Sequence, residues 1–247
     1  LAESLVANSG LDCDDVAKSF AESYRWSRGY GPGAARLLKS IRAGENWRRA
    51  NRSVFAGGSF GNGGAMRAPV LALFASDDRS LLLAMAAEQA SITHAHPRGI
   101  DGARLIALAT WMALGHAPAQ EIFRDLKGLE TAFGERLQWA ADSLDANHSP
   151  SPMEVREALG CGISASDSCV TAVYLSQRFL QCEFGERVAF TARMGGDVDT
   201  VCAMAGAIWG ATRGAGALPA GDLARLEQRS RIETLGAQIR SRVRPGQ

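Results

Sequence analysis

The sequence predicts an all-α fold, and three observations support this. Helix-forming runs recur along the chain, for example from Leu81 to Ala90, where leucine and alanine dominate. Alternating runs of β-branched residues, which are typical of strands, are scarce, and no strand–helix–strand rhythm is present. Glycine-rich segments separate the helical runs. A chain of 247 residues with this pattern is expected to form one compact helical domain.

Capping residues indicate where several helices begin. Ser76, followed by two aspartates, is expected to cap the helix that contains Leu81. Asp101 is expected to cap the next helix, whose apolar residues share one face: Leu105, Leu108, Ala109 and Met112. Residues 151–154 combine a capping box with a proline at the first helical position. A further amphipathic helix is predicted by Val170, Val173, Tyr174 and Phe179.

The bulk composition excludes several classes of protein. Hydrophobic residues make up 46% of the chain, which is enough for a sizeable core. No apolar run approaches the roughly 18–20 residues that span a bilayer, and no signal peptide is visible, so no membrane association is expected. The five cysteines show no C-x-x-C spacing, which disfavours a zinc site. Reduced, mostly buried thiols in a cytoplasmic protein are the simplest interpretation. We also expect a monomer.

The net charge of +1 gives no global reason to expect binding to nucleic acid. One basic stretch stands out, formed by Arg25, Arg28, Arg36, Lys39, Arg42, Arg48, Arg49 and Arg52. Such a run is usually a solvated face, although it also favours an anionic ligand nearby.

The first candidate site is the glycine-rich segment 55–67. Its five glycines are Gly57, Gly58, Gly61, Gly63 and Gly64. Glycines let backbone N–H groups approach a ligand closely, and successive N–H groups can form an anion-binding nest. The pattern Gly57-x-Ser59-x-Gly61 is formally that of a serine-hydrolase nucleophile elbow. That motif needs a buried strand before the serine and a helix directly after it, and neither is predicted here.

The second candidate site is the segment 194–200, which leads into an apolar helical run from Val201 to Trp209. Asp197 can cap this helix, with Asp199 in its first turn, and such a role would be purely structural. Two aspartates and Thr200 are also hard oxygen donors that suit Mg²⁺ or Mn²⁺. The spacing alone leaves both interpretations open.

Together these segments resemble the ADP-ribosylglycohydrolase family. The family motif G-N-G-x-A-M-R matches residues 61–67, and G-G-D-T-D-T matches residues 195–200, with Val198 in place of the middle threonine. Further matches are the M-A-G-A-I at residues 204–208, Arg28 to Gly31, Thr93-His94 and Gly162-Ile163. The resemblance covers essentially the whole chain, and residues 59–64 are most similar to the branch that hydrolyses serine-linked and poly-ADP-ribose.

The resemblance implies a compact orthogonal helical domain over residues 1–247. It implies hydrolysis of ADP-ribose from modified protein side chains, or of poly-ADP-ribose or related O-linked ADP-ribose. Asp197 and Asp199 are implied as catalytic, and Asp197, Asp199 and Thr200 as ligands of two Mg²⁺ ions, with Mn²⁺ as an alternative. The implied substrate-binding residues are Phe55, Gly58, Ser59, Phe60, Gly61, Asn62, His94, Gly162 and Ile163. By itself, His94 also suits a hydrogen-bonded histidine at a helix end.

One part of the family pattern is missing from this sequence. The family's T-D-D-T motif and a further upstream acidic residue are not present. We therefore expect a domain truncated at its N-terminus, with about half of the ligands of a two-metal site. The alternatives to an active hydrolase are a catalytically inactive ADP-ribose-binding module and a purely structural helical domain. The expected partner is ADP-ribose or an ADP-ribosylated protein.

Overall fold

The computed structural model describes residues 1–75, 77–146 and 149–243, and it confirms the all-α prediction. The described residues contain no β-strand, and their one isolated β-bridge joins Gly61 to Ser164. Among the described helices, none combines the length and apolarity that a membrane span requires. All five cysteines are free thiols.

The helices follow one another with short connections. The first eight are α1 (Ala2–Asn8), α2 (Cys13–Ser23), α3 (Pro32–Arg42), α4 (Trp47–Val54), α5 (Gly63–Met66), α6 (Pro69–Phe74), α7 (Arg79–Ser91) and α8 (Pro97–Leu114). The others are α9 (Ala119–Lys127), α10 (Gly134–Asp145), α11 (Pro152–Leu159), α12 (Cys169–Arg178), α13 (Phe184–Met194), α14 (Val198–Arg213), α15 (Ala220–Arg225) and α16 (Arg229–Val243). Short 3₁₀ turns are η1 (Trp26–Arg28), η2 (Ala165–Asp167) and η3 (Ala215–Ala217).

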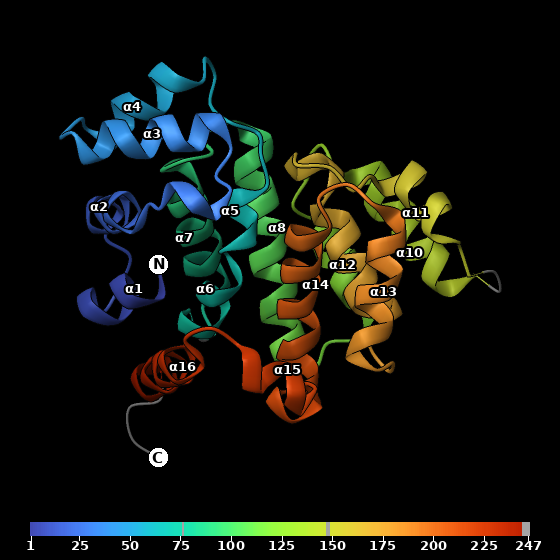
Figure 1. Ribbon diagram of the computed structural model, residues 1–247. Coiled ribbons are helices and arrows are strands. Elements are labelled where there is room, and N and C mark those ends of the chain that lie inside the picture. The colour runs from blue at the N-terminus through green and yellow to red at the C-terminus, as the bar shows by residue number, and fades with distance from the viewer. Residues whose placement is uncertain (76, 147–148, 244–247) are drawn as a thin grey trace.

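Helix α8 occupies the centre of the fold (Figure 1). Helices α5, α6 and α7 pack on one side of it, and α12 and α14 pack on the other. Its apolar residues contribute to two hydrophobic clusters, one shared with α6 and α7 and one shared with α9 to α14. Gly102 allows the close approach of η2 and α12, because a Cβ there would lie 2.7 Å from the Ala165 Cβ and 2.9 Å from the Cys169 Sγ.

The helix starts confirm some of the capping predictions and correct another. Ser151 and Glu154 form the predicted capping box of α11. The prediction for Asp101 is wrong, because α8 begins one turn earlier at Pro97. A proline is well tolerated at the first helical position, where its missing N–H has no helical partner, and the His96 side chain accepts a hydrogen bond from the Arg98 backbone N–H over 3.1 Å. Ser76 lies outside the described residues, and Asp78 is the N-cap of α7.

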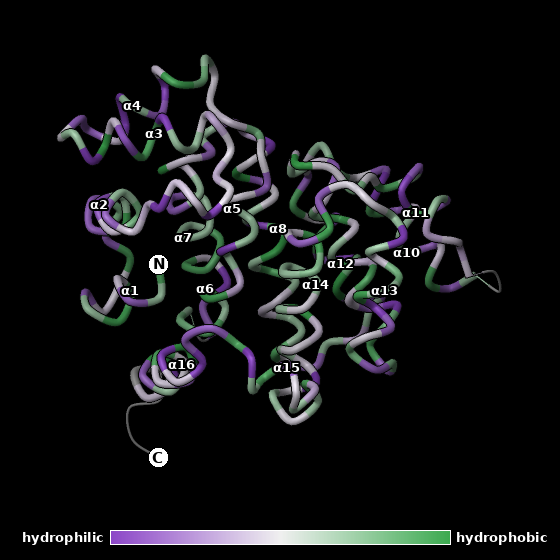
Figure 2. The backbone as a smooth tube through the Cα atoms, in the orientation of Figure 1, coloured by the Kyte–Doolittle hydropathy of each residue, from purple (hydrophilic) through white to green (hydrophobic). Residues whose placement is uncertain are grey.

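The predicted basic stretch lies on the surface of α3 and α4 and in the segment before α3. Figure 2 shows hydrophilic colouring along these outer helices and more hydrophobic colouring on α8 and its neighbours. Arg48 pairs with Asp14 over 2.9 Å and stacks on the Trp47 ring at 4.2 Å, and Arg28 pairs with Glu227. These exposed contacts fit the interpretation of a solvated face.

Candidate functional site

The glycine-rich segment begins where α4 ends, and backbone contacts hold its shape. Gly57 and Gly58 have φ angles of +81° and +86°, in a region that glycine adopts readily. A Cβ on Gly58 would lie only 2.4 Å from the His96 backbone nitrogen, so the segment runs directly against the turn before α8. The His96 backbone N–H donates to the Ser59 carbonyl oxygen over 3.3 Å. The segment is therefore fitted to its neighbour and is not a flexible linker.

Residues 59 and 60 combine unused hydrogen-bond donors with an exposed aromatic ring. Within the described part of the chain, the backbone N–H groups of Ser59 and Phe60 donate to no acceptor. The Phe60 ring is 56% exposed and meets the His96 ring edge-on at 5.7 Å. Ile163, whose backbone accepts from the Asn62 N–H over 3.0 Å, is 77% exposed. Two free amides thus lie beside two exposed apolar side chains.

His94 lies directly against the backbone of the glycine-rich segment. A Cβ on Gly63 would lie 2.7 Å from the ring, and one on Gly61 would lie 3.2 Å from it. The imidazole Nδ1 shares a 2.7 Å hydrogen bond with the Thr93 hydroxyl. Burial, and then the positive charge of Arg67, lower the pKa of His94 to about 3. The ring is therefore neutral near pH 7 and supports the segment by packing.

Arg67 ends the segment and ties it to α7. Its Nε and Nη2 donate to the Gln89 side chain and carbonyl over 2.6 and 2.7 Å, and Nη2 also donates to the Thr93 hydroxyl over 2.9 Å. Nη1 donates to the Gly63 carbonyl over 3.1 Å, and the guanidinium lies 4.8 Å from the Phe20 ring. Burial lowers the pKa of Arg67 to about 9, so it stays charged near pH 7. A buried cation with neutral acceptors thus anchors both Gly63 and Thr93.

Asn62 brings the two candidate segments together. Its side-chain Nδ2 donates to the Asp197 Oδ2 over 2.6 Å and to the Ser168 hydroxyl over 3.1 Å. The Thr200 hydroxyl donates to the other oxygen of Asp197 over 3.1 Å. Asp197 occupies the N-cap position of α14, yet its carboxylate accepts no capping hydrogen bond from the helix backbone. The purely structural interpretation of Asp197 as a helix cap is therefore not what the structure shows.

The second segment is fixed on its other side by the residues that follow α11. The Asp197 backbone N–H donates to the Cys161 carbonyl oxygen over 2.8 Å. A Cβ on Gly196 would lie 1.9 Å from that oxygen, so only glycine fits there. Asp199, in the first turn of α14, is exposed, and among the described residues its side chain makes no hydrogen bond and no ion pair. One carboxylate is thus held in place and the other is free to bind a ligand.

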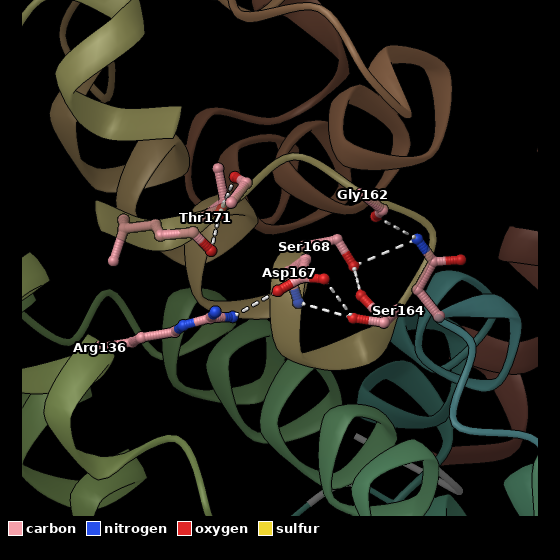
Figure 3. A network of polar contacts seen from close by, with 9 residues as sticks. Arg136, Gly162, Ser164, Asp167, Ser168 and Thr171 are labelled. Carbon is pink, nitrogen blue, oxygen red and sulfur yellow. Dashed lines mark hydrogen bonds and ion pairs between the residues drawn. The ribbon is translucent and has the colours of Figure 1, made fainter. Parts of the chain in front are cut away.

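Residues 160–168 form a third segment between the other two, and its polar network is drawn in Figure 3. Asp167 accepts from Arg136 Nη1 over 2.9 Å and from the Ser164 hydroxyl over 2.8 Å. The Ser168 hydroxyl donates to the Ser164 carbonyl oxygen over 2.7 Å. Burial raises the pKa of Asp167, but these hydrogen bonds and the charge of Arg98 outweigh it, so the net pKa is lowered.

Most of the predicted site residues are neighbours in the structure. The Asn62–Asp197 contact is surrounded by other residues predicted to bind substrate, either directly or through the Gly61–Ser164 bridge. These residues are Ser59, Phe60, Gly61, His94, Gly162 and Ile163. The Phe55 ring fills the space over Gly33 in α3, where a Cβ would lie 2.0 Å from it, and its role at the ligand stays a prediction. Sequence reasoning missed two supporting residues. Ser168 supports Asn62, and Asp167 supports the third segment.

The oxygen donors near Asn62 fit a hard divalent cation in their chemistry. Asp197, Asp199 and Thr200 supply two carboxylates and one hydroxyl within four residues, which are ligand types that Mg²⁺ prefers. Within residues 1–75, 77–146 and 149–243, no group of three or more histidine, cysteine, aspartate or glutamate side chains is placed to hold a metal. These three residues therefore form part of a possible ligand set and not a closed metal site.

Comparison with known proteins identifies a family and several relatives to which this chain is similar. A family model described as ADP-ribosylglycohydrolase matches residues 1–246. ADP-ribosylhydrolase ARH3 from Homo sapiens is 32% identical over 257 residues, which cover 89% of this chain and 69% of the human protein. The protein of that name from Danio rerio is 32% identical over 255 residues, covering 89% and 68%. A solved structure of an ADP-ribosylglycohydrolase-related protein complex has a TM-score of 0.72 at 22% identity, covering 98% of this chain and 78% of that chain, and shares the fold.

Proposed function

Because the chain belongs to the ADP-ribosylglycohydrolase family, we propose that it hydrolyses the glycosidic bond between ADP-ribose and a modified protein side chain. The Asn62–Asp197 hydrogen bond carries this proposal, because it joins the glycine-rich segment to the acidic segment at one place. A serine-linked acceptor is proposed first, with poly-ADP-ribose or related O-linked ADP-ribose as further substrates. The resemblance of residues 59–64 to that branch and the 32% identity to relatives named ADP-ribosylhydrolase ARH3 support this choice.

The proposed metal ligands are Asp197, Asp199 and Thr200, as part of a dinuclear Mg²⁺ site. Asn62 holds one carboxylate oxygen of Asp197, which reduces the freedom of that ligand before any ion binds. Asp199 has no competing protein partner among the described residues, so its carboxylate stays available. When bound, Mg²⁺ would supply a template for the ribose hydroxyls and a lower pKa for a nearby water.

The proposed ADP-ribose cradle is formed by Ser59, Phe60 and Ile163. The free N–H groups of Ser59 and Phe60 can donate to a diphosphate oxygen without breaking a hydrogen bond. The exposed ring of Phe60 and side chain of Ile163 can lose their contact with water against the adenosine part. Cleavage of the glycosidic bond builds positive charge on the ribose ring as water adds to the anomeric carbon and the bond to the side-chain oxygen breaks.

The 247 residues alone should release no ADP-ribose, because they hold about half of the expected metal ligands. The test is therefore an assay of the chain extended upstream of Leu1 by the family's T-D-D-T segment, on serine-linked and arginine-linked ADP-ribosylated peptides across a magnesium titration. Release of free ADP-ribose should depend on magnesium and should be lost in Asp199→Asn. The exposed Asp142→Asn on α10 is the matched control and should keep wild-type turnover. Wild-type turnover in Asp199→Asn would overturn the metal assignment. Release from neither peptide by the extended chain at any magnesium concentration would overturn the proposed hydrolysis.

A second candidate function is that of an ADP-ribose-binding module without turnover. The observation that favours it is the small number of acidic ligands brought together among the described residues. Calorimetry with free ADP-ribose separates the two candidates, because binding without release of ADP-ribose from peptides identifies the module. No binding would leave a purely structural helical domain. Mn²⁺ in place of Mg²⁺, a monomeric state, the lack of nucleic-acid binding and a cytoplasmic location stay predictions.

A further inference from the structure

A second feature beside the candidate site is a cavity of about 160 Å³ with two arginines in its wall. It is lined by Arg98, Ala132, Phe133, Arg136 and Ser166. Arg98 follows His96 by two residues at the start of α8, and Ser166 follows Ile163 by three residues in η2. The cavity thus borders two segments of the candidate site, but none of the residues proposed to bind ADP-ribose or metal lines it.

The donors around this cavity are largely uncommitted. Within the described residues, the Arg98 guanidinium makes no hydrogen bond and no ion pair, and the Ser166 hydroxyl makes no hydrogen bond. Arg136 uses Nη1 to reach Asp167 over 2.9 Å (Figure 3). Its Nη2 and Nε donate to no acceptor in the described part of the chain. A guanidinium presents its donors as a planar fork that matches the oxygens of a phosphate or carboxylate.

The charge in the cavity wall is not balanced. Asp167 is the carboxylate in contact with Arg136, and its second oxygen already accepts from the Ser164 hydroxyl (Figure 3). The two arginines therefore face one carboxylate, which leaves a net positive charge. Arg136 also lies in the first turn of α10, where the exposed Glu135 offsets the positive end of the helix dipole, so the cavity wall owes its positive charge to the two arginines. The imbalance favours an anion.

The size of the cavity limits the ligand. Pockets for nucleotides and drug-sized molecules usually span roughly 300–1,000 Å³. A volume of about 160 Å³ is below that range but corresponds to roughly five water molecules. A tetrahedral oxyanion fits this space, whereas a whole ADP-ribose does not.

We propose that the cavity between Arg98 and Arg136 is a binding site for a phosphate dianion, separate from the ADP-ribose site. The two guanidinium groups supply charge-assisted hydrogen bonds to the phosphate oxygens, and the Ser166 hydroxyl supplies a third donor. The phosphate group comes either from inorganic phosphate or from a phosphoserine side chain, because the same donors recognise both.

The experiment is a titration of the isotope-labelled full chain with inorganic phosphate, and separately with O-phosphoserine, at constant ionic strength. Saturable shifts should appear at the Nε–H groups of both arginines and at the Ser166 amide. Arg98→Gln should weaken phosphate binding by about tenfold or more, since a hydrogen bond to a charged group is lost. Arg104→Gln, on the same helix but paired with Asp101, is the matched control and should bind as the wild type does.

The titration that gives the tighter binding identifies the source of the phosphate group. The site is supported whichever of the two ligands binds more tightly. Shifts that never saturate, or an Arg98→Gln affinity within about twofold of wild type, would overturn it. Calorimetry with ADP-ribose on the same variants should give unchanged affinity. A failure of the phosphate site is therefore distinguishable from a failure of the proposed function.

Discussion

The Asn62 side-chain amide donates to the Asp197 carboxylate over 2.6 Å, although 135 residues separate them in the sequence. The same nitrogen lies 3.1 Å from the Ser168 hydroxyl and 3.4 Å from the Gly162 carbonyl oxygen, so it joins three segments. The Asp197 carboxylate accepts this hydrogen bond and does not cap α14. A missing cap costs about 1 kcal/mol, and a charge-assisted hydrogen bond offsets a loss of that size.

Replacement of Asn62 by alanine tests how much this contact stabilises the fold. Asn62→Ala removes one hydrogen bond from Asp197, which keeps the Thr200 hydroxyl, and one from Ser168, which keeps the Ser164 carbonyl oxygen. The free energy of unfolding should therefore fall by about 1–3 kcal/mol. The measurement is urea denaturation followed by circular dichroism. Asn8→Ala is the matched control, because Asn8 also donates to a carboxylate, that of Asp15, but is exposed. An equal loss in both variants would contradict the central role of Asn62.

The adjacent glycines 57 and 58 allow a paired test of the cradle. Both have positive φ, but a Cβ on Gly57 meets nothing within 4 Å, whereas one on Gly58 would lie 2.4 Å from the His96 nitrogen. Gly57→Ala should therefore cost about 1 kcal/mol from backbone strain alone. Gly58→Ala should cost at least about 2–3 kcal/mol, because steric overlap is added. Thermal unfolding with equal losses for the two variants would show that the segment moves away from His96 freely.

The accuracy of the sequence-based predictions depended on the range of the interactions concerned. The Ser151 capping box was predictable because its partner lies three residues away. The start of α8 was mispredicted because Asp101 and the pair His96-Pro97 are both acceptable caps, and proline at the first position decides between them. The local sequence was therefore informative about a helix start wherever only one residue was an acceptable cap.

Prediction of the site was limited in the same way, because its contacts join residues that are far apart in the sequence. The Asn62–Asp197 contact brings the two motif segments together, although they are far apart in the sequence. The support from Ser168 was not predictable, because it is 106 residues from Asn62 and belongs to no motif. The role of Phe55 at the ligand stays a prediction. Its ring packs over Gly33 of α3, and the local sequence could not show this packing, which depends on the missing side chain of a residue in another helix.

The partly buried His94 makes the stability of the fold sensitive to acid. Burial, followed by the charge of Arg67, lowers its pKa to about 3 from an ordinary value of 6.5. Between these values the unfolded chain binds a proton that the folded chain does not, so stability falls as pH decreases through this window. At pH 5 the loss amounts to about 2 kcal/mol relative to neutral pH.

His94→Gln should remove that part of the pH dependence. Urea denaturation at pH 7 and pH 5 should therefore give a difference in unfolding free energy that is about 2 kcal/mol smaller in the variant than in the wild type. His116→Asn, in the exposed turn after α8, is the control and should keep the wild-type difference. A His94→Gln variant with unchanged acid sensitivity would show that other groups cause it.

Arg187 in α13 is a fully buried cation whose hydrogen-bonding groups are mostly unused. Its Nε and Nη2 find no acceptor among the described residues, and its Nη1 reaches the Cys202 carbonyl oxygen only at 3.5 Å. The guanidinium lies 4.8 Å from the Phe184 ring and 5.6 Å from the Trp209 ring. Burial lowers the pKa of Arg187 because the charged form loses its hydration.

Replacing this cation by methionine should stabilise the protein. Methionine keeps most of the volume and packs well against aromatic rings, while the desolvation cost of the charge disappears. Arg187→Met should therefore raise the free energy of unfolding by roughly 1–4 kcal/mol, whereas Arg187→Ala should lower it through the cavity it leaves. The exposed Arg193→Met on the same helix is the control and should change little. If urea denaturation showed Arg187→Met to be less stable than the wild type, the attraction between the guanidinium and its two rings would outweigh the cost of burying the charge.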